Sequence, residues 1–148
     1  MRKGLRLLLI IMVLVTGAAI AEAQQPKKLS RIGYLSPGPA SRPSARLEAF
    51  RQGLRELGYV EGQNIVIEYR FAEGKLDRLP ELVAELVRLK VDVIFAYSTP
   101  AVQAVKKATT TLPIVTVSGD PVRSGFVASR ARPGGNITGL ANLTPELV

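Results

Sequence analysis

Three polar segments, each placed directly after an apolar run, contain the residues best suited to hold a small charged molecule. Ser36 ends the run LSRIGYLS, Tyr97-Ser98-Thr99-Pro100 follows VDVIFA, and Gly119-Asp120-Pro121 follows PIVTVS. Hydroxyl and backbone N–H groups can hold a carboxylate, whereas the carboxylate of Asp120 can face an ammonium or a hydroxyl group. The combination predicts a binding site for a small zwitterionic solute.

The passage from strand to helix at residues 96–105 indicates how an anionic group would be held. Thr99 is a good N-cap, because its hydroxyl can accept a hydrogen bond from a free N–H group of the first turn. Pro100 suits the first helical position, since its φ is already fixed and it lacks an N–H group that would remain unbonded there. The other free N–H groups at such a helix end attract negative charge.

Each of these residues also has a purely structural interpretation, which the sequence leaves open. Thr99 could act only as a helix cap, and the side chain of Tyr97 could simply pack. Asp120 precedes Pro121, so it could cap a further short helix that begins there.

The composition argues against an enzyme. The chain contains no His and no Cys, so the usual general base, the thiol nucleophile and most transition-metal ligands are missing. The hydrolase motif GxSxG, the phosphate-binding motif GxxxxGK[ST] and the dinucleotide-binding motif GxGxxG are also absent. We therefore expect a binding protein with no catalytic residues, no metal and no cofactor.

The positive charge does not indicate a nucleic-acid partner. The chain has 20 Lys and Arg against 12 Asp and Glu, a formal net charge of +8. Beyond the first 23 residues the basic side chains are scattered, with Lys27-Lys28 and Lys106-Lys107 as the adjacent pairs. No aromatic residues alternate with them, so a solvated basic surface is the better interpretation.

The first 23 residues have the pattern of an export signal. A basic start is followed by an apolar stretch from Leu7 to Val15 and by small residues at Ala21 and Ala23, which predicts cleavage after Ala23. A membrane anchor is the alternative, but the apolar stretch is short for a span. We therefore expect a signal peptide at 1–23, a linker at 24–30 and a periplasmic chain that does not span the membrane. Without cysteine, a lipid anchor on that residue is excluded.

Strand and helix patterns alternate through the rest of the chain. We expect strands at 29–36, 64–72, 91–97, 113–118 and 136–140, separated by helices over 47–57, from about 77 and from 99. This order predicts an α/β fold: a parallel βαβ sheet with helices on both faces. Residues 64–72 alternate between apolar and polar, which favours an edge strand. The last residues, TPELV, have the pattern of another helix start.

Four segments resemble the bacterial ABC-transporter substrate-binding proteins of the group that includes the tryptophan and tyrosine receptors. They are EAFRQGLRELGYVEGQNIVIEYRFAEGK, DRLPELVAELVRLKVDVI, STPAVQAVKKAT and PIVTVSGDPVRSGFVASRARPGGNITGL. The resemblance runs from about Arg31 to the end of the chain. It implies one lobe of a type I periplasmic binding protein, with residues 31–148 as the N-terminal lobe of a longer, two-lobed protein.

By this resemblance the protein would deliver a small, amino-acid-like solute to an ABC permease in the inner membrane. The ligand-binding residues would lie on turns at the carboxyl ends of the strands: Ser36, Tyr97, Ser98, Thr99, Pro100, Gly119 and Asp120. Two residues depart from the family pattern, since Ser98 stands where glycine is common and Arg130 where an apolar residue is common. The alternative is an exported sensor or adaptor lobe that binds a membrane protein without delivering a solute.

Overall fold

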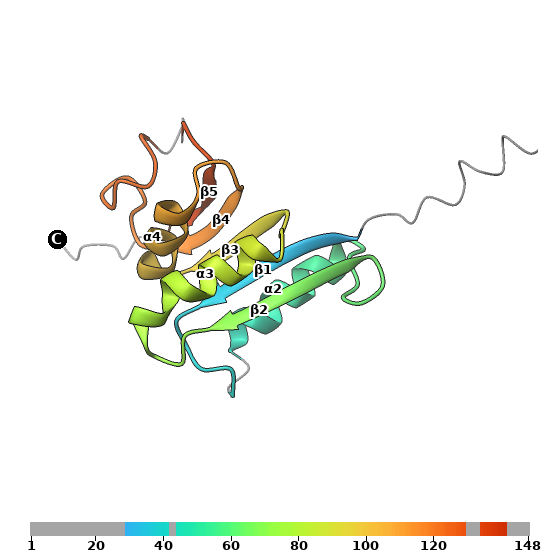
Figure 1. Ribbon diagram of the computed structural model, residues 1–148. Coiled ribbons are helices and arrows are strands. Elements are labelled where there is room, and N and C mark those ends of the chain that lie inside the picture. Colours follow the sequence, from blue (N-terminus) through green and yellow to red (C-terminus); the bar gives the residue numbers. More distant parts are fainter. Residues whose placement is uncertain (1–28, 42–43, 130–133, 142–148) are drawn as a thin grey trace, which may run out of the picture.

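The five strands form one parallel sheet, as the alternation of patterns predicts. The structure is a computed structural model that describes residues 29–41, 44–129 and 134–141. The sheet has the order β2-β1-β3-β4-β5, and every neighbouring pair is parallel (Figure 1). The strands are β1 (Ser30–Ser36), β2 (Ile65–Phe71), β3 (Val93–Tyr97), β4 (Ile114–Ser118) and β5 (Ile137–Ala141).

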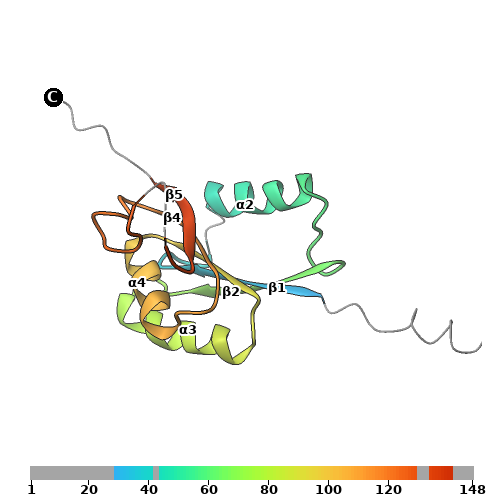
Figure 2. The same ribbon diagram turned by 90° about the horizontal axis from the view of Figure 1, so that it is seen from above.

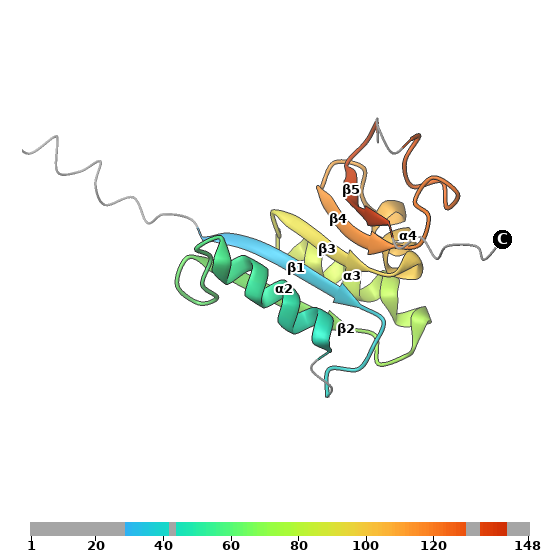
Figure 3. The ribbon, with the colours of Figure 1, turned by 180° about the vertical axis from the view of Figure 1, so that it is seen from behind.

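Helices cover both faces of this sheet. Helix α2 (Ala45–Glu56) lies on one face, whereas α3 (Leu79–Arg88) and α4 (Thr99–Ala108) lie on the other (Figures 2 and 3). A short 3₁₀ turn, η2 (Leu76–Arg78), leads into α3. From β1 the chain moves outward to β2 and then reverses to reach β3. Because crossovers keep one hand, this reversal moves the connecting helix to the opposite face.

Helix α2 is present, and it begins two residues and ends one residue before the expected range of 47–57. The hydroxyl of Ser44 accepts a hydrogen bond of 3.1 Å from the N–H group of Leu47, which caps the first turn. After the helix, Gly58 has a φ of +82°, a left-handed conformation that glycine adopts without a steric penalty. The apolar stripe of α2 packs on the sheet through Leu47, Phe50 and Leu54.

The core consists of two layers, one on each side of the sheet. On the side of α3 and α4 the layer is aliphatic, with fully buried residues such as Val83, Leu86 and Val102. On the side of α2 it is aromatic and centred on Tyr34, which is 2% exposed. Tyr34 contacts four other rings: those of Phe50, Tyr69, Phe71 and Phe95.

Two expectations about the strands are confirmed and one about a helix is wrong. Strand β2 is at the sheet edge, and β5 is present as the fifth strand. The short helix that could begin at Pro121 is absent, since residues 121–125 form hydrogen-bonded turns. A single bond from the N–H of Ser124 to the carbonyl of Asp120 closes one helix-like turn, and the chain does not continue it.

Several sequence-based expectations concern residues outside the described part of the chain. These are the signal peptide at 1–23, most of the linker at 24–30 and the helix start at 144–146. Arg130, noted as a departure from the family pattern, is also outside it. Within the described residues, no helix combines the length and the hydropathy that a bilayer crossing requires.

Candidate functional site

The carboxyl ends of β1 and β3 form the point where the connections of the sheet diverge. The two strands are neighbours, yet the chain leaves β1 toward α2 on one face and leaves β3 into α4 on the other. In open parallel sheets, ligands bind in the crevice beyond such a point. Leu35 pairs with Ala96, so the next step of the register brings Ser36 beside Tyr97.

Ser98 connects β3 to α4 in a strained conformation. Its φ of +89° and ψ of 154° fall in a region that is otherwise used almost only by glycine. Its N–H donates to the carbonyl of Val117 and its carbonyl accepts from the N–H of Val102, both at 3.1 Å. Its hydroxyl oxygen is buried and has no hydrogen-bond partner among the described residues.

The assignment of Thr99 as the helix cap is wrong by one position. Ser98 occupies the N-cap position, Thr99 is the first helical residue and Pro100 follows it in the first turn. The hydroxyl of Ser98 makes no capping bond, because the φ of this residue is not the extended conformation in which a serine side chain reaches the first turn. The start of α4 therefore has no side-chain cap.

Thr99 and Gly119 lie next to each other beyond the paired ends of β3 and β4. A Cβ atom added at Gly119 would lie 3.8 Å from Oγ1 of Thr99, which is ordinary van der Waals contact. The space beside the first residue of α4 would therefore admit a Cβ atom at Gly119 without a clash.

The carboxylate of Asp120 takes part in a cap of the following turn. Its Oδ1 atom accepts hydrogen bonds from the N–H groups of Val122 (3.0 Å) and Arg123 (3.2 Å). Asp120 thus caps a turn, and not the short helix that the sequence left open. Contact between Asp120 and a solute stays a prediction.

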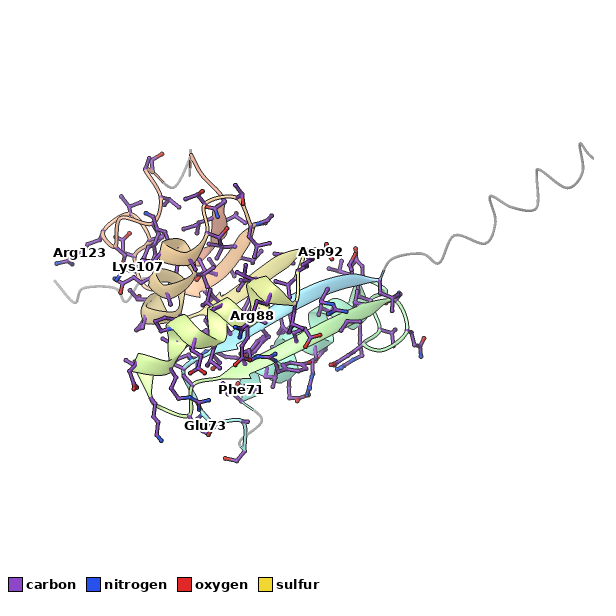
Figure 4. All side chains as sticks on the ribbon, viewed as in Figure 1. Phe71, Glu73, Arg88, Asp92, Lys107 and Arg123 are labelled. Atoms are coloured by element: carbon purple, nitrogen blue, oxygen red, sulfur yellow. The ribbon has the colours of Figure 1, made fainter. Side chains whose placement is uncertain are left out.

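Ser36 shapes the loop after β1, and Glu73 holds that loop in place. The Ser36 hydroxyl accepts a hydrogen bond of 3.2 Å from the N–H of Gly38. The Glu73 carboxylate accepts one of 2.9 Å from the N–H of Ala40. Glu73 lies just beyond the carboxyl end of β2, close to Phe71 (Figure 4). No local sequence pattern marks Glu73, because the contact joins loops 33 residues apart.

Arg46 is a second residue at this edge that was not among the predicted site residues. Its guanidinium carbon lies 4.4 Å from the centre of the Tyr97 ring, within the range of a cation–π interaction. A local signal was available, because Arg46 is in the first turn of α2, where a cation opposes the helix dipole.

A separate cavity lies along β5, the edge strand opposite β2. It has a volume of about 230 Å³, and none of the seven predicted ligand-binding residues lines it. Its lining comprises Thr116, Pro121, Val127, Ser129, Ile137, Thr138, Gly139, Leu140 and Ala141. Because it has few charged or converging polar groups, we place the candidate site at the divergence point between β1 and β3. Among the described residues, no cluster of three or more carboxylates could hold a metal ion.

Comparison with known proteins agrees with the α/β fold described above. Residues 40–146 match the model of the family described as ABC transporter substrate binding protein. This chain belongs to that family. A curated relative of this substrate-binding protein, the tyrosine-binding protein of Clostridioides difficile, is 36% identical over 96 residues. That match covers 64% of this chain and 28% of the relative.

Solved structures show the same fold. A ligand-free, open substrate-binding protein with adhesive properties from Clostridium difficile matches with a TM-score of 0.73 and 29% identity, over 78% of this substrate-binding protein and 40% of that chain. An ABC domain in complex with L-Trp from Streptococcus pneumoniae matches with a TM-score of 0.69 and 30% identity. The match covers 77% of this chain and 39% of that chain. A conserved domain protein from Vibrio cholerae matches with a TM-score of 0.70 and 32% identity, over 80% of this chain and 40% of that chain. The chain therefore spans about two-fifths of each solved relative.

Proposed function

We propose that this protein is the exported solute-binding component of an ABC importer, and that it binds an amino-acid-like solute where β1, β3 and β4 end. Family membership supports the general role, and the divergence point between β1 and β3 supports the position of the site. The N-terminal signal pattern supports export to the periplasm, and the family supports an inner-membrane permease as the partner.

The relatives indicate which amino acids to test first. One is named a tyrosine-binding protein and another was solved with L-Trp, so an aromatic L-amino acid is the leading candidate. In this proposal the start of α4, at Ser98 and Thr99, faces the solute carboxylate, and Asp120 faces its ammonium group. Tyr97 and Gly119 shape the space between them.

Ser98 is the observation that carries this proposal. A buried hydroxyl without a partner costs free energy, and so does a non-glycine residue in this region of φ and ψ. Such costs concentrate at ligand-binding positions, where they are offset when a ligand supplies the missing bond. The position of Ser98 at the start of α4 and beside the divergence point is consistent with that role.

The test separates the hydroxyl from the backbone strain. L-Trp and L-Tyr are titrated calorimetrically into the full natural chain and into its Ser98→Ala and Ser98→Gly variants. Both variants should bind about 2- to 10-fold more weakly, as expected for one lost hydrogen bond. Ser98→Gly should also be more stable by about 1 kcal/mol, because the relief of strain exceeds the added entropy of the unfolded chain.

Thr111→Ala provides the matched control, because this exposed hydroxyl lies in the connection from α4 to β4, at the other edge of the sheet. It should leave binding unchanged. A folded wild-type protein that binds no amino acid would contradict the proposed function. Unchanged affinity in both Ser98 variants would contradict the role proposed for the Ser98 hydroxyl, but not the proposed function.

A further inference from the structure

Two of the three arginines of helix α2, Arg46 and Arg51, each lie over a tyrosine ring. The guanidinium carbon of Arg46 is 4.4 Å from the ring centre of Tyr97, and that of Arg51 is 4.9 Å from the ring centre of Tyr69. The two side chains have the same chemistry on the same helix, so differences in their surroundings are informative.

Arg51 is fully engaged by neighbouring groups. It pairs with Glu48 at 3.2 Å and with Glu61 at 3.8 Å, and its Nε–H donates to the Tyr69 hydroxyl at 2.9 Å. These contacts join α2 to strand β2 and to the segment before it. The charge of Arg51 is therefore used within the fold.

Arg46 has a different environment. Among the described residues, no carboxylate lies within ion-pair distance of its guanidinium, and the side chain is exposed. It sits in the first turn of α2, where the helix dipole makes a cation unfavourable. Local rules of this kind are most often violated at functional positions.

The position of Arg46 is at the carboxyl edge of the sheet. Tyr97, on which it stacks, is the last residue of β3 and the neighbour of Ser98. A guanidinium that stacks on a ring keeps its in-plane N–H donors available, and their fork geometry matches a carboxylate. The stacking also limits the rotamers of Arg46, which reduces the entropy lost on binding.

We infer that Arg46, stacked on Tyr97, is a specificity-determining residue that binds the carboxylate of the solute. This inference rests on the proposed function and adds to it a side-chain cation that the start of α4 does not supply. With Arg46 in this role, tight binding requires a negatively charged group on the solute. Tyr97 positions the guanidinium by stacking against it.

The experiment is a double-mutant cycle in which one change is made in the protein and the other in the ligand. Calorimetry on the full natural chain compares an aromatic L-amino acid with its carboxamide, in wild type, Arg46→Gln and Arg46→Lys. Arg46→Gln should weaken binding of the acid about 10- to 100-fold, the usual effect of losing a charge-assisted hydrogen bond. The same substitution should change binding of the amide less than about 3-fold, because the carboxamide has no negative charge for Arg46 to pair with. The two changes are then not additive, as expected for groups in contact. Arg46→Lys should recover part of the affinity.

Arg51→Gln is the matched control. It removes the same charge from the same helix and should weaken the acid and the amide equally or not at all. Equal losses for acid and amide in Arg46→Gln would overturn the inference, because they would show an effect through structure and not through the carboxylate. Unchanged binding in Arg46→Gln would overturn it as well. If the folded wild-type protein binds neither ligand, the proposed function fails and this inference with it.

Discussion

At the scale of single residues, two glycines show how differently the same residue type is used. Gly139 in β5 pairs with Thr116 of β4 and has a φ of +150°. A Cβ atom there would lie 1.9 Å from the carbonyl oxygen of Thr116 and 2.7 Å from its nitrogen. Gly53 in α2 has nothing within 4 Å of its added Cβ atom. Position 139 therefore has no space for any side chain, whereas position 53 has space for one.

Gly139→Ala should therefore destabilise the protein by about 3 kcal/mol or more, because the clash is with backbone that cannot move without unpairing β4 and β5. Gly53→Ala should stabilise it by about 0.5–1 kcal/mol, because alanine has the higher helix propensity. Urea unfolding followed by circular dichroism measures both. Similar effects of the two substitutions would show that the close approach at Gly139 relaxes.

At the scale of elements, the aromatic layer under α2 couples stability to alkaline pH. The ring of Tyr34 stacks on that of Phe95 at 5.4 Å and contacts that of Phe50 at 5.3 Å. Burial raises the pKa of the Tyr34 hydroxyl above its usual value of 10.0, and this outweighs the opposing hydrogen bond with Ser44 and the charge of Arg46. The neutral hydroxyl is therefore the form that the folded state favours.

The sign of the pH effect follows from proton binding. Above pH 10 the unfolded chain releases the Tyr34 proton while the folded chain retains it, so the stabilisation is complete below that pH and is lost as the pH rises through the folded pKa. Tyr34→Phe should make the free energy of unfolding fall less steeply between about pH 9 and pH 11 than in wild type. Denaturant titrations across this range measure it. Parallel slopes would contradict the assignment.

At the scale of the whole molecule, the sheet order predicts a gradient of local stability. Strand β3 is central and lies between β1 and β4, whereas β5 is an edge strand of five residues whose Leu140 is 71% exposed. Amides that are covered on both faces and paired on both sides open only in large-scale unfolding.

Native-state hydrogen exchange should therefore show the slowest amides in β1 and β3. Those of β5 should exchange at least about tenfold faster, because a strand with one neighbour and an exposed face can open alone. Equal protection of β3 and β5 would show that the sheet unfolds as a single cooperative unit.

The sequence by itself determined the order and type of the elements. The spacing of Leu47, Phe50 and Leu54 and the glycine at position 58 were enough to predict α2, because they act through contacts within a few residues. The alternation of strands and helices was sufficient to predict a parallel sheet with both faces covered. It also indicated which strand ends carry Ser36, Tyr97 and Gly119, because carboxyl ends of parallel strands share one edge.

The tertiary structure decided what those residues do at that edge. The N-cap of α4 is Ser98 and not the expected Thr99. Ser98 has a positive φ, and its N–H donates to the carbonyl of Val117, a bond that depends on the neighbouring strand β4. The contact between Arg46 and Tyr97 joins residues 51 positions apart and exists only when α2 packs over β3. Local propensities act over one or two turns, so contacts between elements distant in the chain had to come from the packing of the sheet.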